Sequence, residues 1–157
     1  MRITRCVSVV CLSILSLLGG AACGSPTTAQ VSATASPEKL LVTDVIVGAG
    51  DAVTSGAWVR VHYTGWLQDP AATDGKGTSF DSSHIRAEPF VFQVGKQKVI
   101  RGWDEGLVGM RAGGTRRLVI PPSLGYGSRG AGGGVIPANA TLVFDIELVD
   151  FLPAIGP

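Results

Sequence analysis

The sequence predicts an α+β domain in which an antiparallel sheet buries one face against a single short helix. Three segments support this prediction. Residues 58–64 (WVRVHYT) and 141–149 (TLVFDIELV) alternate between apolar and polar side chains, as half-buried strands do. Residues 99–110 (VIRGWDEGLVGM) are the one segment whose apolar residues recur with helical spacing.

The first two strands are expected at residues 40–47 and 58–64. The earlier segment, LLVTDVIV, is rich in β-branched apolar residues and is broken by a GAGD turn. In the later segment the apolar and the polar side chains occupy opposite faces. Residues 66–79 are rich in Asp, Gly, Pro and Thr, which predicts a loop.

Three more strands are expected further along the chain. Residues 89–94 (PFVFQV) place Phe90 and Phe92 on one face. Residues 115–120 (TRRLVI) include apolar and β-branched residues and are predicted to form a strand, which the two prolines that follow would end. In residues 141–149 the apolar side chains face inward and the two carboxylates face outward.

The helix of residues 99–110 is expected to be short. Ile100, Trp103 and Leu107 fall at positions i, i+3 and i+7, which places them on one face. Three glycines within the segment lower its helix propensity. We therefore expect packing, rather than local preference, to hold this helix.

The first 22 of the 157 residues are predicted to be a signal peptide. Arg2 and Arg5 precede an apolar stretch at residues 7–18, which is too short to cross a bilayer as a mature helix. Small residues follow in GGAAC and end at Cys23, which is the order of a secretory signal.

Cys23 favours the lipoprotein type of signal. A cysteine directly after small residues resembles the site at which bacterial lipoproteins are cut and lipidated on the thiol. Gly20 departs from that pattern, because a larger aliphatic residue is usual there. Plain secretion after cleavage near Ala22 is the alternative. We expect residues 23–38 to be a disordered polar tether and residues 39–153 to be the folded domain.

The charge and cysteine content exclude several classes of protein. Removing Arg2 and Arg5 leaves 11 of the 13 basic residues against 12 acidic residues, so the mature chain carries a net charge of −1. Without a basic run, nucleic-acid binding has no electrostatic basis. Only Cys23 remains after the signal peptide, so an intrachain disulfide is impossible, and no metal-ligand spacing is present.

The glycine-rich stretch GYGSRGAGGGVIP resembles a dinucleotide-binding fingerprint in its GxGxxG spacing, at Gly125, Gly127 and Gly130. That fingerprint needs a strand directly before it and a helix directly after it. Here two prolines precede it and AGGGVIP follows it, so no βαβ unit is possible. The sequence predicts no nucleotide site.

The residues for acid–base or nucleophilic catalysis are also missing. His62 and His84 are the only histidines and are predicted to lie at the surface. Ser128 lacks the glycine pattern of a nucleophile elbow, because Tyr126 stands two residues before it. Asp104 and Glu105 are neighbours on the predicted helix, so their side chains diverge. A reaction in this domain has to avoid proton transfer and covalent intermediates.

Aromatic side chains, in contrast, are spread over most of the predicted elements. Phe92 is expected in the core. Tyr63 and Tyr126 carry hydroxyls that need partners if they are buried. Phe80 directly precedes Asp81 at the end of a polar segment. Aromatic rings that converge with a few polar groups are typical of a pocket for an apolar ligand.

Five blocks of sequence resemble the FKBP-type peptidyl-prolyl cis-trans isomerases. The blocks appear in the family's order over residues 40–152: VHYTGWL, SFDSS, PFVFQVGKQKVIRGWDEGLVGM, RRLVIPPSLGYG and IPANATLVFDIELV. The resemblance implies an antiparallel sheet of about five strands wrapped around one short α-helix. It also implies that residues 126–137 form a loop over a pocket, although this loop is one residue longer than the short form. Lys98 stands where the family often has an acidic residue.

The resemblance implies two groups of site residues. A catalytic role would fall to Tyr63, Asp81, Ile100, Tyr126 and Phe144. Substrate binding would fall to Phe80, Arg86, Phe90, Val99, Trp103 and Ile136. No cofactor or metal is implied.

The expected function is the acceleration of Xaa–Pro isomerisation in exported proteins, in the cell envelope. The expected partners are proline-containing peptides, unfolded exported proteins, macrolide inhibitors and, through lipidated Cys23, a membrane. No segment for dimerisation is recognised, so a monomer is expected. Two alternatives remain. One is a non-catalytic peptide- or ligand-binding module of the same fold, and the other is an envelope interaction protein that depends on its tether.

Overall fold

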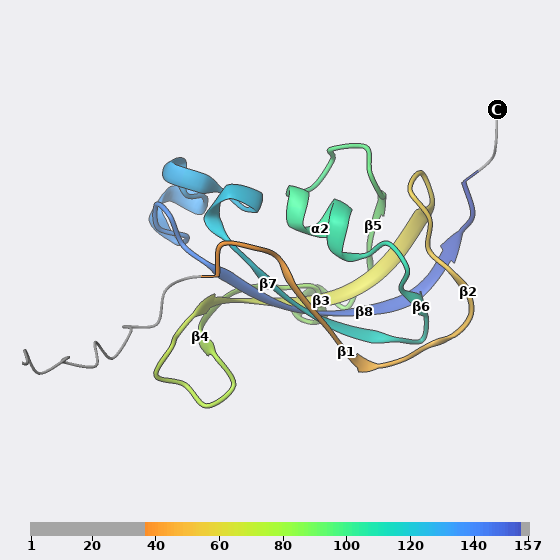
Figure 1. The fold of residues 1–157 in the computed structure, drawn as a ribbon, viewed down its shortest axis with the longest axis horizontal. Helices are drawn as coiled ribbons and strands as arrows, with labels where there is room; N and C mark the ends of the chain where they lie inside the picture. The colour runs from red at the N-terminus through yellow and green to blue at the C-terminus, as the bar shows by residue number, and fades with distance from the viewer. Residues whose placement is uncertain (1–36, 155–157) are drawn as a thin grey trace, which may run out of the picture. The chain divides into compact units, whose positions relative to one another are not determined.

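Six antiparallel strands form the main sheet of this protein, whose computed structural model describes residues 37–154 (Figure 1). The strand order is β1–β7–β8–β3–β4, and β5 also pairs with β3. The strands are β1 Leu41–Ile46, β3 Trp58–Gln68, β4 Lys76–Ser82, β5 Phe90–Gln93, β7 Thr115–Ile120 and β8 Leu142–Leu152. Because β4 and β5 pair with different parts of β3, the six strands occupy five rows. The predicted α+β fold is confirmed, with six strands in the main sheet where about five were predicted.

The predicted signal peptide, Cys23 and most of the predicted tether lie outside the described residues. No helix within residues 37–154 is long and apolar enough to span a membrane.

The alternating segments bury the faces that the sequence predicts. In β3 the side chains of Val59 and Val61 are fully buried, whereas Arg60 is exposed and His62 is half-buried. In β8 the side chains of Leu142, Ile146 and Leu148 are buried. These two central strands pair along most of their length and form the middle of the core.

The prediction of a loop at residues 66–79 is wrong at both ends. β3 continues to Gln68, and β4 begins at Lys76. The strands persist because β3 also pairs with β8, which places Trp66 opposite Val143. The Lys76 ammonium lies 4.2 Å from the centre of a Trp66 ring and 2.7 Å from an Asp145 oxygen. These partners are distant in sequence, so local composition does not indicate them.

The prediction of a turn at GAGD (residues 48–51) is also wrong, because three of its four residues belong to β2 (Ala49–Ala52). This strand pairs with β6 (Arg111–Ala112) in a separate two-stranded sheet. The pairing continues into the next residue, where the Val53 N–H donates to the Met110 carbonyl at 2.8 Å. The partner lies about sixty residues away, beyond the reach of a turn prediction.

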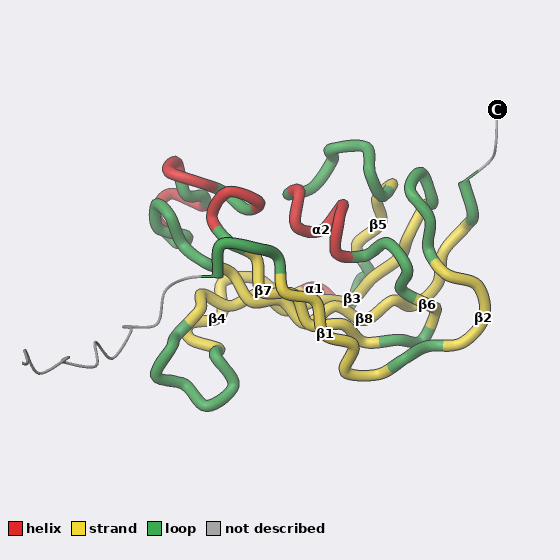
Figure 2. Tube along the Cα trace, in the orientation of Figure 1, coloured by secondary structure: helices red, strands yellow, loops and turns green. Residues whose placement is uncertain are grey.

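Residues 37–154 contain two α-helices, of which the sequence predicted one. The predicted helix is α2 (Arg101–Gly106), which lies over one face of the sheet (Figure 2). It ends before residue 110, because Gly109 adopts a φ of 82° and its N–H bonds to the Val53 carbonyl. The second helix is α1 (Ser83–Arg86), a single turn between β4 and β5. Short 3₁₀ segments follow β7: η1 Pro122–Leu124, η2 Gly127–Arg129 and η3 Gly132–Gly134.

Glycines set the distance between α2 and β7. A Cβ on Gly102 would lie 2.5 Å from the Ile120 side chain, and one on Gly106 would lie 2.7 Å from Leu118. Contacts that short are forbidden, so only glycine permits this approach. The glycines that weaken the helix locally are therefore required by its packing.

Buried Arg116 connects α2 to the edge of the sheet. Its guanidinium donates to the carbonyls of Gly106 (2.7 Å) and Val108 (3.0 Å) and to both carboxylate oxygens of Asp44 on β1. A cation at the C-terminal end of a helix is favoured by the helix dipole. Full hydrogen bonding makes the burial of this charge tolerable.

A second ion cluster connects β4, β7 and β8. Asp145 accepts hydrogen bonds from Arg117 and Lys76, each with a contact of 2.7 Å. Burial works to raise the pKa of Asp145, but these two partners outweigh it and lower the pKa below the ordinary 3.8. The carboxylate therefore stays ionised and holds three strands together.

We predict that Gly106→Ala destabilises the protein by roughly 1–3 kcal/mol, the usual cost of overpacking a core. Helix propensity alone predicts the opposite sign, a gain of about 1 kcal/mol. Urea denaturation of both proteins measures the difference. Glu105→Ala is the matched control, because it changes an exposed position on the same helix. A Gly106→Ala protein as stable as the parent would contradict the packing argument.

Candidate active site

An open cavity of about 210 Å³ lies where α2 meets the sheet. Side chains from β3, β4, β5, β8 and α2 reach it, together with residues of the β5–α2 turn and the segment between η1 and η2. The residues that line it are Tyr63, Phe80, Asp81, Phe90, Lys98, Val99, Ile100, Trp103, Tyr126 and Phe144. They are predominantly aromatic and aliphatic, as in a site for an apolar group.

Trp103 of α2 forms the floor of the cavity and is only 4% exposed. The rings of Tyr63 and Phe144 meet its indole edge to face, with centroids 5.0 Å and 5.2 Å away. Phe92 packs behind it at 5.6 Å and does not line the cavity. The indole N–H finds no hydrogen-bond acceptor among the described residues, so the floor presents an aromatic surface.

A glycine in β3 allows the opposite wall to form. Phe80 and Phe144 meet edge to face with centroids 5.5 Å apart. A Cβ on Gly65 would lie 2.6 Å from the Phe144 ring and 2.7 Å from the Phe80 ring. The absence of a side chain at this position therefore lets both rings reach the cavity.

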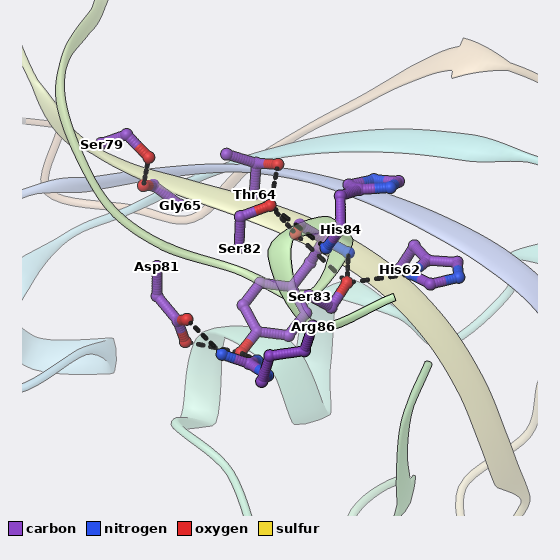
Figure 3. Close-up of polar contacts among 10 residues, drawn as sticks. His62, Thr64, Gly65, Ser79, Asp81, Ser82, Ser83, His84 and Arg86 are labelled. Carbon is purple, nitrogen blue, oxygen red and sulfur yellow. Dashed lines mark hydrogen bonds and ion pairs between the residues drawn. The ribbon is translucent and has the colours of Figure 1, made fainter. Parts of the chain in front are cut away.

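Tyr63, Asp81 and Arg86 form a polar triangle at the edge of the cavity (Figure 3). The Tyr63 hydroxyl donates to Oδ2 of Asp81 at 2.6 Å. The Arg86 guanidinium donates to Oδ1 of Asp81 at 2.8 Å and to the Tyr63 oxygen at 2.9 Å. Asp81 and Tyr63 line the cavity, whereas Arg86 lies behind them.

The triangle determines the charge state of its members. Burial works to raise the pKa of Asp81, but hydrogen bonds from Tyr63 and Arg86 outweigh it and lower the pKa below 3.8. Burial and the hydrogen bond to Asp81 raise the pKa of Tyr63 above 10.0. Burial and the negative charge of Asp81 raise the pKa of Tyr126 in the same direction. Near neutral pH, Asp81 is ionised and both phenols keep their protons.

The serines beside α1 hold this helix in place. The Ser83 hydroxyl accepts the Tyr63 N–H at 2.9 Å and lies 3.0 Å from Nδ1 of His62. The Ser82 hydroxyl caps the helix by accepting the His84 N–H. The rings of His62 and His84 stack with centroids 4.7 Å apart (Figure 3). Since Arg86 ends this helix, these contacts position the guanidinium.

The Ser83–His62 contact does not form a catalytic dyad. Ser83 is 1% exposed, and its hydroxyl is occupied by the backbone of Tyr63. Neither residue lines the cavity. His84 is exposed and His62 is half-buried, as expected of side chains on the outer face.

Ile100 lines the cavity and has a backbone N–H without a backbone partner in residues 37–154. It is the N-cap of α2, with extended backbone, and its carbonyl accepts the Trp103 N–H at 2.9 Å. Its own N–H makes no backbone hydrogen bond within the described residues. Val99 precedes it and also lines the cavity.

The glycine-rich segment forms a lip that begins at Tyr126. Tyr126 is 39% exposed and lines the cavity. Ala131 and Ile136 exchange two backbone hydrogen bonds of 3.0 Å and 3.1 Å, which close a small hairpin. Gly130 has a φ of 62°, and a Cβ there would lie 2.3 Å from the Ile136 carbonyl oxygen. These glycines serve backbone geometry, and no parallel strand pair for a nucleotide site occurs within residues 37–154.

The structure brings most of the predicted site residues together at one cavity. Ile136 does not line it: its side chain is 6% exposed and belongs to the core beneath the lip. Lys98, noted in the sequence only as a departure from the family pattern, does line the cavity. Lys98 directly precedes Val99, a predicted site residue, and this position in the sequence could have indicated that it lies at the cavity. Within residues 37–154 no group of three or more metal-ligating side chains is found.

The sequence matches a known family over most of the described domain. Residues 50–149 match the model of the FKBP-type peptidyl-prolyl cis-trans isomerases. The chain belongs to this family. It is an isomerase of Xaa–Pro peptide bonds, and the resemblance seen in its sequence blocks is confirmed.

Individual relatives are similar over nearly the same region. The FK506-binding protein of Neisseria meningitidis serogroup A is 48% identical over 110 residues, 70% of this chain and 94% of that protein. Peptidyl-prolyl cis-trans isomerase FPR2 of Saccharomyces cerevisiae is 53% identical over 95 residues, 60% of this chain and 65% of that protein. The crystal structure of FkpA from Escherichia coli has a TM-score of 0.61 and 45% identity, covering 74% of this isomerase and 49% of that chain.

We predict that Arg86→Met raises the pKa of Asp81, because burial remains while the cation and its hydrogen bond are lost. In the parent, the lowered pKa stabilises the fold above the ordinary pKa of 3.8, and this contribution disappears as the pH falls through the folded-state value. Carboxyl-carbon NMR titration measures both proteins. Asp145 is the internal control, since Arg117 and Lys76 stay in place. An unchanged Asp81 titration would refute the role of Arg86.

Proposed function

We propose that this isomerase accelerates Xaa–Pro isomerisation in the folding of exported proteins, at the cavity above Trp103. The observation that carries the proposal is the composition of this cavity: its lining is mostly aromatic and aliphatic, with few polar side chains. Isomerisation breaks no covalent bond, so it suits a site whose phenols and carboxylate keep their charge states near neutral pH.

The barrier to isomerisation comes from the partial double bond of the amide. It amounts to about 18–20 kcal/mol, and the uncatalysed flip takes roughly 10–100 s. Conjugation is lost in the twisted transition state, which makes the amide less dipolar. A dry aromatic cavity therefore disfavours the planar amide relative to the twisted one. A million-fold acceleration requires about 8 kcal/mol of such differential stabilisation.

Each part of the cavity has a role in this proposal. The proline ring packs on Trp103, between the Phe80, Phe90 and Phe144 rings. The Ile100 N–H and the Tyr126 hydroxyl donate to carbonyls of the substrate on either side of the prolyl bond. Asp81 lies beside the twisting amide, and Arg86 and Tyr63 hold it as a fixed dipole. Preorganised dipoles of this kind cost no reorganisation during the reaction.

The same cavity is proposed to bind macrolide inhibitors. Relatives with about half of their residues identical are named FK506-binding proteins. The lining residues of this cavity present the aromatic surface that a bulky apolar ligand needs.

We further propose that the isomerase is exported and anchored by a lipid on Cys23. The support is the order of charged, apolar and small residues in the first 22 positions, followed directly by Cys23. A polar tether over residues 23–38 would leave the domain free to reach unfolded chains. Secretion without a lipid is the alternative.

The first experiment measures the cis-to-trans rate of short peptides with Leu or Phe before the proline. We expect clear acceleration by the purified chain. Tyr126→Phe removes one donor and should lower kcat/KM roughly two- to ten-fold, and Asp81→Val roughly ten- to a hundred-fold. Ser128→Ala is the control, because this exposed lip residue does not line the cavity. A folded parent chain that gives no acceleration would overturn the proposal.

Peptide binding separates the isomerase from a binding module of the same fold. In an isomerase, Asp81→Ala and Phe144→Tyr reduce turnover more than they reduce peptide affinity, because they act on the transition state. Equal losses in kcat/KM and in affinity, measured by calorimetry with the same peptides, would favour the binding module.

Lipidation is tested by Cys23→Ser in the native host. We expect the parent chain in the membrane fraction and the variant in the soluble fraction, because the thiol that would carry the lipid is lost. Mass spectrometry of the mature N-terminus identifies the modification directly. A parent chain that is soluble and unmodified would favour plain secretion.

A further inference from the structure

Two charged residues line the cavity, and the charge of one of them is already paired. Both oxygens of Asp81 are occupied, by the Tyr63 hydroxyl and by the Arg86 guanidinium. The second charged side chain is Lys98, on the turn between β5 and α2. It has no ion pair among the residues that the structure describes.

The carboxylates of α2 are engaged elsewhere. Asp104 accepts the backbone N–H groups of Gly95 (2.8 Å) and Gln97 (2.9 Å). Glu105 pairs with Arg101 at 3.1 Å. Neither carboxylate of α2 forms an ion pair with Lys98 at this edge of the cavity.

The turn that bears Lys98 is held rigidly. The two hydrogen bonds that Asp104 accepts fix the backbone of the turn, and they hold Gln97 at a left-handed φ of 55°. Lys98 comes next, followed by Val99 and Ile100, which both line the cavity. The side chain of Lys98 thus starts from a fixed backbone position at the edge of the cavity, and its flexible stem is long enough to bring the ammonium group over the opening.

We propose that Lys98 determines specificity by favouring substrates with a carboxylate side chain next to the isomerised Xaa–Pro bond. The proposal rests on the proposed function of the cavity. Side chains that flank the proline emerge at the edge of the cavity, where Lys98 attracts an Asp or Glu and repels a Lys or Arg. An exposed pair of this kind changes kcat/KM by roughly two- to five-fold, and salt screens it.

The experiment uses the full-length chain and peptides that differ at one position. Glu, Gln or Lys is placed before the proline in one series and after it in a second series. We expect kcat/KM to fall in the order Glu, Gln, Lys in at least one series, and the differences to shrink at high salt. Lys98→Glu should reverse this order.

Lys96→Glu is the matched control, because it makes the same charge change on the same turn without reaching the cavity. We expect it to keep the order of the parent. Equal rates for Glu and Lys peptides in both series would overturn the proposal, and so would a reversal by Lys96→Glu as large as that by Lys98→Glu.

The Gln peptides separate this inference from the proposed function. If the parent chain fails to accelerate the Gln peptides, the isomerase site itself is wrongly placed. If it accelerates them but does not distinguish Glu from Lys, only the role of Lys98 is refuted.

Discussion

The close packing of α2 on β7 is the constraint on which the rest of the structure depends. Without a Cβ on Gly102 or Gly106, the helix lies nearer to the sheet than side chains normally allow. This approach brings Trp103 among the rings that rise from β3 and β8, where the indole becomes the floor of the cavity. Arg116 then fixes the far end of the helix by donating to the carbonyl of Gly106, its last residue, and to that of Val108 just beyond it. The core and the active site are thus built by the same contacts.

The proposed chemistry uses neither acid–base nor nucleophilic catalysis. Amide rotation needs no proton donor or nucleophile, and the mechanism that we propose relies on a cavity of fixed charge and low polarity. Asp81 is kept ionised by Arg86 and Tyr63, and burial keeps the phenols protonated. The hydroxyls of Ser82 and Ser83 accept backbone N–H groups and thereby hold α1 in place. This single helical turn positions Arg86, which belongs to the polar triangle. Of the two charged residues that line the cavity, Lys98 is the one without an ion pair in the described part of the chain. We therefore infer that it selects among substrates.

Much of the fold and of the cavity could be predicted, because local patterns report which face of an element is buried. The alternation in β3 and β8 identified the inward side chains correctly, and the spacing around Trp103 located the short helix. The sequence blocks led to the cavity through their resemblance to a family. The same reasoning placed Ile136 in a wall, whereas its side chain anchors the lip from inside the core. A family pattern transfers the position of a residue more reliably than the direction of its side chain.

The sequence by itself determined the fold class, the buried faces of the central strands and the shortness of α2, since each depends on residues a few positions apart. Only the tertiary structure decided that β2 is a strand, that β3 and β4 extend into the predicted loop, and that Arg116 is buried. The physical reason is the same in all these cases. A strand needs hydrogen bonds from a partner that is distant in sequence, and the state of a charge depends on which counter-charges and carbonyls folding places beside it.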